Sequence, residues 1–445
     1  MKIRSLLILL LSMWIAPLIL AQQTPQSLAD AELPSLLAIY KDIHSHPELS
    51  GREERTAALV ARELRAAGCE VTEQFGKYNN PTLKCYGVIG IMKNGEGPKV
   101  LVRTDMDALP VGEETGLPYA STVVAKNVEG KDVSVMHACG HDAHISMFVG
   151  VARELAKLKD QWHGTIIFVA QPAEETGSGA RALLQGGLYE QFGKPDFALG
   201  FHDKADMQTG HIGVTEGYTY ANVDSVDVTI RGVGSHGAHP HMGKDPIVIA
   251  AQTIMALQTI DSREIDPLEP VVVTVGSIHG GTKHNVIPDE VKLQLTVRTY
   301  KDEVRKQTLE AIERIVKGIA AAAGVPKDRE PIVTVRDEHT PATYNSPELV
   351  ERVCSVFRNT IGADNVIKRE PVMGGEDFGR YGREEPKIPI FLFRLGVTES
   401  AKMGASKQPG AAPLPSLHSS KFIPDRTAIK TGVVTMSAAA LDLLK

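Results

Sequence analysis

Short apolar runs that alternate with amphipathic stretches constrain the fold of this chain more than any other feature. Residues 99–103 and 165–170 are apolar runs that predict buried strands, and residues 143–158 and 179–185 have helical spacing. Strands that alternate with helices predict an α/β unit with a largely parallel sheet and helices on both faces. Two further helices are expected before this block, over residues 28–46 and 56–67.

The pattern changes after Ala221. Residues 223–230 alternate apolar and polar side chains, which is typical of a strand with one buried face. Further strands and helices predict a β-α-β-β-α-β-like α+β block with an antiparallel, ferredoxin-like sheet: strands 271–275 and 291–297, helices 245–261 and 303–323. We therefore expect a larger unit formed by residues 28–223 and 336–445, with a smaller unit over residues 224–335 inserted into it.

The first pattern resumes after about Val335. We predict a strand over residues 390–394 and a last helix that begins at Asp425 or Arg426. Residues 398–414 are rich in Gly, Ala, Pro and Ser, and this composition predicts a loop.

The N-terminus has the pattern of a targeting segment. Lys2 and Arg4 precede an apolar run over residues 6–20, and polar residues follow Ala21. This pattern predicts a cleavable signal peptide over residues 1–21 and a secreted or periplasmic protein. The alternative is an uncleaved membrane anchor, although the run is short for a bilayer span.

Composition argues against a nucleic-acid partner. The net charge is −6 and only 5% of the residues are aromatic. Binding to phosphates favours a basic face, and binding to single-stranded bases favours aromatic stacking.

Five polar segments follow apolar strands or open helices, where open α/β sheets bind ligands. They are Asp105-Met106-Asp107 and residues 137–144, 171–177, 200–203 and 417–422. In the second segment Cys139 lies among His137, His141 and His144, a donor set that suits a transition metal such as zinc. Gly140 would let the backbone bend so that its neighbours face one point. Spacing alone does not fix which histidine is a ligand.

The third segment carries two adjacent carboxylates, Glu174 and Glu175, after an apolar strand. Buried carboxylates are costly unless they are paired or bind a cation. Adjacent side chains at a strand end point apart, so one could be a metal ligand and the other a general base. The alternative is a solvated acidic loop. His202 and His418 are weak signals alone and gain weight only within the set.

Together these segments resemble the metal-dependent amidohydrolases and peptidases that include hippurate hydrolase, indole-acetyl-amino-acid hydrolase, aminoacylase and glutamate carboxypeptidase. The resemblance extends from residues 44–50 to the final helix. Three motifs resemble the hippurate and auxin-conjugate branch: residues 105–110, Cys139-Gly140-His141-Asp142 and residues 171–175.

The resemblance implies a site for two divalent metal ions, zinc or manganese, with cobalt as a further candidate. The ligands that it implies are Cys139, His141, Glu175, His202 and His418. Cys139 would be the bridging ligand, Glu174 the general base, and Asp107 a residue that orients the metal site. The roles of Asp105, which stands where the wider family has a histidine, and of Asp203 stay open.

For the inserted unit, the resemblance implies a lid that also forms a homodimer. His236 matches a histidine that reaches the active site of the neighbouring subunit. Asn285 and Arg298 match residues that hold the substrate's carboxylate, and Glu376 lies in a loop expected to position substrate.

The implied reaction is hydrolysis of the amide bond of an N-acyl amino acid, which releases a free amino acid and a carboxylic acid. A dipeptidase or carboxypeptidase is the alternative with the same chemistry. A non-catalytic metal-binding or peptide-binding relative is another, although it would not need Glu174 beside Glu175. The signal peptide argues against a biosynthetic deacetylase of diaminopimelate precursors. Cys69 and Cys85 are close enough in sequence to pair, and Cys139 is expected to be unpaired.

Overall fold

An eight-stranded sheet forms the centre of the larger unit. The computed structural model describes residues 23–445, so the predicted signal peptide lies outside the described residues. In spatial order the strands are β1 (Glu70–Phe75), β2 (Gly87–Asn94), β6 (Gly164–Gln171), β3 (Lys99–Asp105), β7 (Phe197–Gln208), β18 (Ile390–Thr398), β8 (Ile212–Val214) and β17 (Val366–Lys368). The four central strands, β6, β3, β7 and β18, are parallel to one another.

Both faces of this sheet are buried, as the continuous apolar strands predict. Alternate side chains of β3 enter different cores: Val100 and Val102 lie on one face and Leu101 on the other. The first face is covered by α1 (Pro25–His44), α2 (Glu54–Ala66), α3 (His141–Lys157), α8 (Pro347–Ile361) and α10 (Ala428–Leu443). The second face is covered by α4 (Gly179–Gln185), α5 (Leu188–Phe192) and the 3₁₀ turn Asp377–Gly382.

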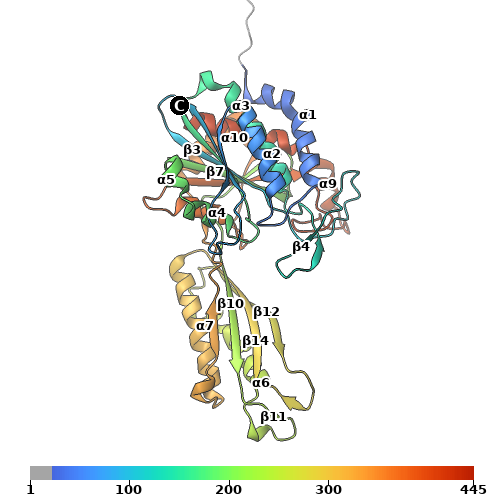
Figure 1. Cartoon of the computed structure of the whole chain (residues 1–445), viewed down its shortest axis with the longest axis vertical. Helices are drawn as coiled ribbons and strands as arrows, with labels where there is room; N and C mark the ends of the chain where they lie inside the picture. The colour runs from blue at the N-terminus through green and yellow to red at the C-terminus, as the bar shows by residue number, and fades with distance from the viewer. Residues whose placement is uncertain (1–22) are drawn as a thin grey trace, which may run out of the picture.

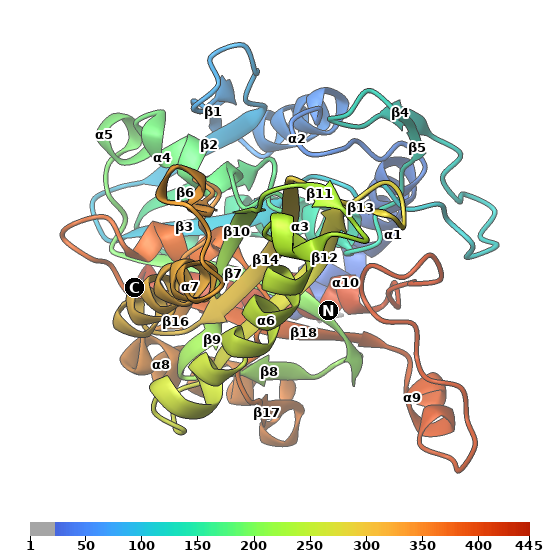
Figure 2. The same cartoon turned by 90° about the horizontal axis from the view of Figure 1, so that it is seen from below.

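The smaller unit extends from the larger one in Figure 1 and contains its own core. Its antiparallel sheet has the order β12 (Val271–Gly280), β14 (Glu290–Thr299), β10 (Asn222–Arg231), β15 (Ile332–Val335). Two helices, α6 (Pro246–Leu257) and α7 (Asp302–Ala322), pack on one face of it, as Figure 2 shows from below. The chain order β10–α6–β12–β14–α7–β15 is the predicted ferredoxin-like order.

Shorter elements complete the chain. Three two-stranded ladders pair β4 (Val124–Lys126) with β5 (Asp132–Ser134), β9 (Gly217–Tyr220) with β16 (Thr343–Asn345), and β11 (Ser235–His236) with β13 (Val286–Ile287). Among the described residues, no helix combines the length and the apolar character that crossing a membrane requires.

One expectation needs correction: the segment 398–414 is not wholly a loop, because α9 (Ser400–Ser406) forms within it. The structure also answers the question that the sequence left open for Cys69 and Cys85. Both are free, and they lie in the cores on opposite faces of the sheet.

Candidate metal centre and active site

The predicted polar segments converge at the carboxyl ends of the central parallel strands. Asp105 is the last residue of β3, Gln171 is the last residue of β6, and His202 lies in β7. His141 is the first residue of α3, which begins beside them. This edge of an open α/β sheet is where such folds bind ligands.

Two triplets of donor atoms share one sulfur atom. Cys139, His141 and His202 form one group, and Cys139, Glu175 and His418 form the other. Within each triplet, the donor atoms all lie within 4.8 Å of one another. The structure therefore brings together all five predicted ligands, and it places Cys139 at the only position that the two triplets share.

The chemistry of these donors fits two divalent cations. Cys139 Sγ lies 3.5 Å from His202 Nε2 and 3.2 Å from His418 Nε2. His141 Nε2 and Glu175 Oε1 are buried, and neither has a hydrogen-bond partner among the described residues. Buried polar atoms without partners are rare and call for a missing group. Sulfur, imidazole and carboxylate donors together suit zinc, manganese or cobalt.

Left-handed backbone conformations flank the ligands. Gly140, between Cys139 and His141, has φ 79°, Ala173 has φ 52° and His418 has φ 67°. Such conformations are costly for residues other than glycine and persist where the surroundings enforce them. Three of them around one cluster indicate that the backbone is shaped to aim these side chains.

Asp107 fixes the backbone that carries the two glutamates. Its Oδ1 accepts a hydrogen bond from the Glu174 N–H at 3.0 Å, and its Oδ2 accepts one from the Glu175 N–H at 3.0 Å. Its backbone oxygen lies 2.8 Å from His141 Nδ1. This fully buried carboxylate thus contacts both the base candidate and a ligand candidate, a geometry that fits the expected orienting role.

Glu174 lies beside the cluster, with its Oε2 4.0 Å from His141 Nε2. Burial, together with the charges of Glu376, Glu175 and Asp377, raises the pKa of its carboxyl well above the ordinary value. A raised pKa makes the ionised carboxylate a stronger base than an ordinary glutamate. Nearby cations would lower that pKa again and would favour the ionised form.

A buried arginine beneath the cluster was missed by the sequence analysis. Arg103 is 1% exposed, and its guanidinium reaches Asp105 at 2.6 Å, Glu376 at 2.9 Å and Asp377 at 3.4 Å. The sequence feature that could have indicated this buried charge is the position of Arg103 at the end of the apolar run 99–103. Burial alone would raise the pKa of Asp105. The positive charges of His141, His144 and Arg103 have the larger effect and hold the pKa of this carboxyl well below its ordinary value.

Glu376 lies within this charge network and not on an open surface. It is 1% exposed, and its Oε1 accepts hydrogen bonds from Arg103 Nη2 and from the backbone N–H of Phe378. Its other oxygen is buried and has no partner among the described residues. The Glu376 carboxylate forms a group of donor atoms with Asp105 and His202. Its predicted contact with substrate stays a prediction.

The structure does not bring His236 or Asn285 to the cluster of the same chain. Both lie at the β11–β13 end of the smaller unit, where the Gly237 N–H donates to the Asn285 backbone oxygen. Figure 1 shows β11 at the far end from the larger unit. Arg298 lies at the other end of β14, with its guanidinium near Gly375. Because β14 spans roughly 30 Å, one chain cannot present Asn285 and Arg298 to the same carboxylate.

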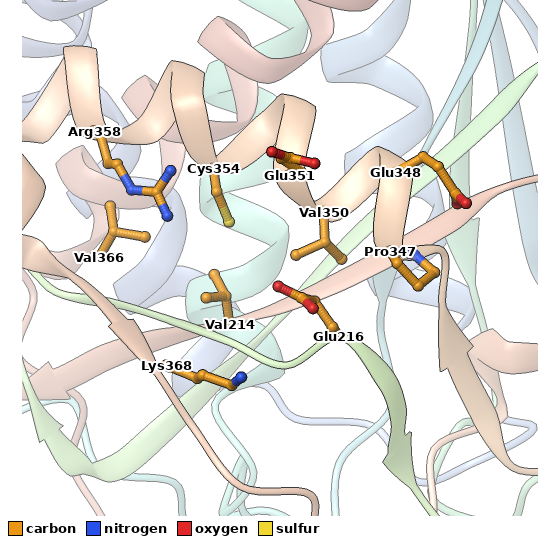
Figure 3. Close-up of a pocket in the computed structure, with 10 residues that line it drawn as sticks. All are labelled: Val214, Glu216, Pro347, Glu348, Val350, Glu351, Cys354, Arg358, Val366 and Lys368. Carbon is orange, nitrogen blue, oxygen red and sulfur yellow. The ribbon is translucent and has the colours of Figure 1, made fainter.

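A pocket elsewhere in the larger unit is not the reaction site. It has a volume of about 540 Å³ and lies between α8 and strands β8 and β17. Figure 3 shows Val350 and Cys354 pointing from the helix toward Val214, and Arg358 and Lys368 are also among the lining residues. Neither Glu174 nor any of the five predicted ligands lines it.

The chain is similar to known hydrolases and peptidases over most of its length. Residues 101–411 match the model of peptidase family M20/M25/M40. Thermostable carboxypeptidase 1 of Saccharolobus solfataricus is 34% identical over 409 residues, covering 91% of this chain and 94% of the relative. Hippurate hydrolase of Campylobacter jejuni is 37% identical over 343 residues, covering 77% and 83%.

The fold of the chain is also similar to that of a solved structure from the same family. A Bacillus subtilis protein described as a dinuclear metal binding peptidase of the M20 family aligns with a TM-score of 0.73 at 30% identity. The alignment covers 93% of this chain and 99% of that chain.

Proposed function

This chain belongs to peptidase family M20/M25/M40 and is a hydrolase, and from that premise we propose that it cleaves the amide bond of N-acyl amino acids. The products are a free amino acid and a carboxylic acid. The observation that carries the proposal is the pair of donor triplets that share Cys139, with Glu174 beside them.

In the proposed mechanism Cys139, His141 and His202 would hold one divalent cation, and Cys139, Glu175 and His418 would hold a second. Bound there, the two cations would supply Lewis-acid chemistry at the scissile carbonyl and at the attacking water. Glu174 accepts a proton from the attacking water as the oxygen bonds to the carbonyl carbon. When the carbon–nitrogen bond breaks, Glu174 returns that proton to the leaving nitrogen. Asp107 holds the Glu174 backbone N–H throughout.

Recognition of the substrate's carboxylate requires two subunits in this proposal. Arg298 would supply a guanidinium fork from the chain that holds the cluster. His236 and Asn285, which one chain cannot bring there, would come from the partner subunit. His236 of the partner subunit would donate to the oxygen that gains negative charge during the reaction.

Surface features of the smaller unit support a homodimer. Val248, Ala251 and Met255 are exposed on α6, and their three- and four-residue spacing places them on one stripe. Val248 is 52% exposed and Met255 is 71% exposed. Strand β12 lies at the edge of the sheet, and an edge strand can pair with another chain.

Peptide hydrolysis is the second candidate, because the carboxypeptidase of Saccharolobus solfataricus covers most of this chain. A dipeptide and an N-acyl amino acid present the same amide beside a free carboxylate. We also propose that residues 1–21 direct export of the protein, on the basis of the basic and apolar pattern of that segment.

The test is release of amino acid from a panel of N-acyl amino acids and dipeptides, detected with ninhydrin. Metal-free protein is assayed alone and with added zinc, manganese or cobalt. We expect metal-dependent release that falls about 10²- to 10⁴-fold in Glu174→Gln. The better substrate class decides between acyl-amino-acid hydrolase and peptidase. No release from any substrate, with two ions bound per chain, would contradict the proposal.

A further inference from the structure

We propose that the cluster binds its two ions unequally, and that Asp203 is a positioning residue that makes the ion between His141 and His202 the tighter one. This rests on the proposed function, because it takes the two triplets around Cys139 as metal sites. Beyond the proposed function, the protein is expected to retain one ion more tightly than the other, and Asp203, which is not a ligand, causes this difference in affinity.

The first step concerns the ring nitrogens that face away from the cluster. His202 Nε2 faces Cys139, and its Nδ1 donates to the Asp203 backbone oxygen at 2.9 Å and lies 3.1 Å from the Asp203 carboxylate. His141 is held in the same way, since its Nδ1 lies 2.8 Å from the Asp107 backbone oxygen. A histidine whose other nitrogen is held by a carbonyl or carboxylate has a fixed tautomer and orientation and binds metal more strongly.

The second step concerns how Asp203 itself is held. It is 1% exposed, and its backbone N–H donates to His144 Nε2 at 3.1 Å. His144 Nδ1 lies 2.7 Å from Asp105 Oδ1, and Arg103 Nη1 donates to Asp105 Oδ2 at 2.6 Å. A buried polar chain thus runs from Arg103 through Asp105, His144 and Asp203 to His202. Such a chain restricts His202 before any ion arrives.

The Asp203 carboxylate also lies against the turn that carries two of the ligands. A Cβ atom at Gly140 would lie 2.0 Å from Asp203 Oδ2, so the two groups are in close contact. Neither Asp203 oxygen accepts a hydrogen bond of good geometry from a described residue. A buried carboxylate without such bonds needs nearby positive charge. An ion between His141 and His202 would supply that charge and would be stabilised by it.

The other triplet lacks this support. The side chain of His418 is 55% exposed, and of its two ring nitrogens only Nε2 has a hydrogen-bond partner among residues 23–445, Cys139. Its backbone is in the left-handed region, at φ 67°. An ion held by Glu175 and His418 therefore has a ligand that is open to water and free to rotate. We expect this ion to dissociate first.

The experiment measures zinc affinity by chelator competition on the full chain, with zinc alone as the probe. We expect two classes of site in the wild-type protein. His418→Ala should keep one tightly bound zinc ion, whereas His202→Ala should keep only weak binding. Asp203→Asn, which removes the charge and keeps the shape, should weaken the tight site roughly 10- to 100-fold and leave the weak site close to its wild-type affinity.

Asp206→Asn is the matched control, because Asp206 lies on the same strand and its side chain is 57% exposed. It should bind zinc as the wild type does. A variant that failed to fold would lose both ions, so selective loss of the tight site separates positioning from misfolding. Equal affinities in the wild type, or an unchanged tight site in Asp203→Asn, would overturn the inference alone. Absence of zinc binding to the wild type would overturn the proposed function as well.

Discussion

At the scale of single residues, Gly140 combines a backbone requirement with a packing requirement. Its φ is 79°, and a Cβ atom there would lie 2.0 Å from Asp203 Oδ2. The residue separates Cys139 from His141, so any shift of its backbone moves two candidate ligands at once.

We therefore expect Gly140→Ala to destabilise the metal-free protein by about 1–3 kcal/mol and to reduce zinc binding to fewer than two ions per chain. Thermal melts in chelator and metal analysis of the purified protein measure these two effects. Gly116→Ala is the control, since Gly116 has φ 71° and no heavy atom within 4 Å of its built Cβ. If both variants bound two zinc ions, the close contact with Asp203 would have no role in shaping the site.

The structure brings together the five ligand candidates that were predicted from the sequence, whereas the buried groups that hold them could not be predicted. Cys139, His141 and Glu175 lie in short motifs whose chemistry is visible locally. The partners of Arg103 include Glu376, which is 273 positions away, and no local pattern links the two. For Asp203, sequence left open both a solvent position and a role at the metal, and the structure shows that it is buried. Long-range pairing of buried charges is decided by the fold and not by spacing.

At the scale of elements, α3 carries a buried acid that the proposed reaction does not use. Glu154 is 0% exposed, and neither of its side-chain oxygens has a hydrogen-bond partner among the described residues. Burial raises the pKa of its carboxyl to about 8. The folded protein therefore holds a proton that the unfolded chain releases above about pH 4.5, and Glu154 reduces stability as pH rises from about 4.5 to 8.

Glu154→Gln removes this titration and keeps the shape of the side chain. We expect it to raise the free energy of unfolding at pH 8 by on the order of 2–4 kcal/mol and to have little effect at pH 4.5. Denaturant unfolding across this pH range measures the difference. Glu351→Gln, at an exposed position on α8, should follow the wild-type curve. Equal stabilisation by Glu154→Gln at both pH values would show that folding does not raise the pKa of the Glu154 carboxyl.

Most elements with a strong apolar pattern were predicted, although β2 (Gly87–Asn94) was missed despite its run of buried residues. The strand expected over residues 165–170 is β6 (Gly164–Gln171), because its side chains are buried on both faces. Strand β1 was missed because it lies at the sheet edge and most of its side chains are exposed. Helix α9 was missed because it has only seven residues in a stretch with loop-like composition.

At the scale of the whole molecule, the two-unit arrangement separates groups that the proposed reaction uses together. His236 lies at the far end of the smaller unit, and the cluster lies in the larger unit (Figure 1). In the proposed mechanism a second chain supplies His236, so the first chain needs no large rearrangement. Activity should therefore depend on dimer formation.

We expect Met255→Asp, which places a charge on the exposed stripe of α6, to yield a folded monomer with activity lowered at least about 10-fold. Sedimentation velocity measures the oligomeric state, and the ninhydrin assay measures activity. Val128→Asp is the control, because Val128 is fully exposed on the larger unit, in the turn between β4 and β5. A monomeric Met255→Asp with full activity would contradict the role proposed for the partner's His236.

The most direct test of the central claim is a cobalt titration of metal-free protein that follows sulfur-to-cobalt absorption and amino-acid release in the same samples. The account predicts that both signals rise together and reach a plateau by two cobalt ions per chain, and that Cys139→Ser loses the absorption and most of the release. Release that is equally fast in the metal-free protein, or cobalt binding without sulfur absorption, would contradict hydrolysis at a metal pair centred on Cys139.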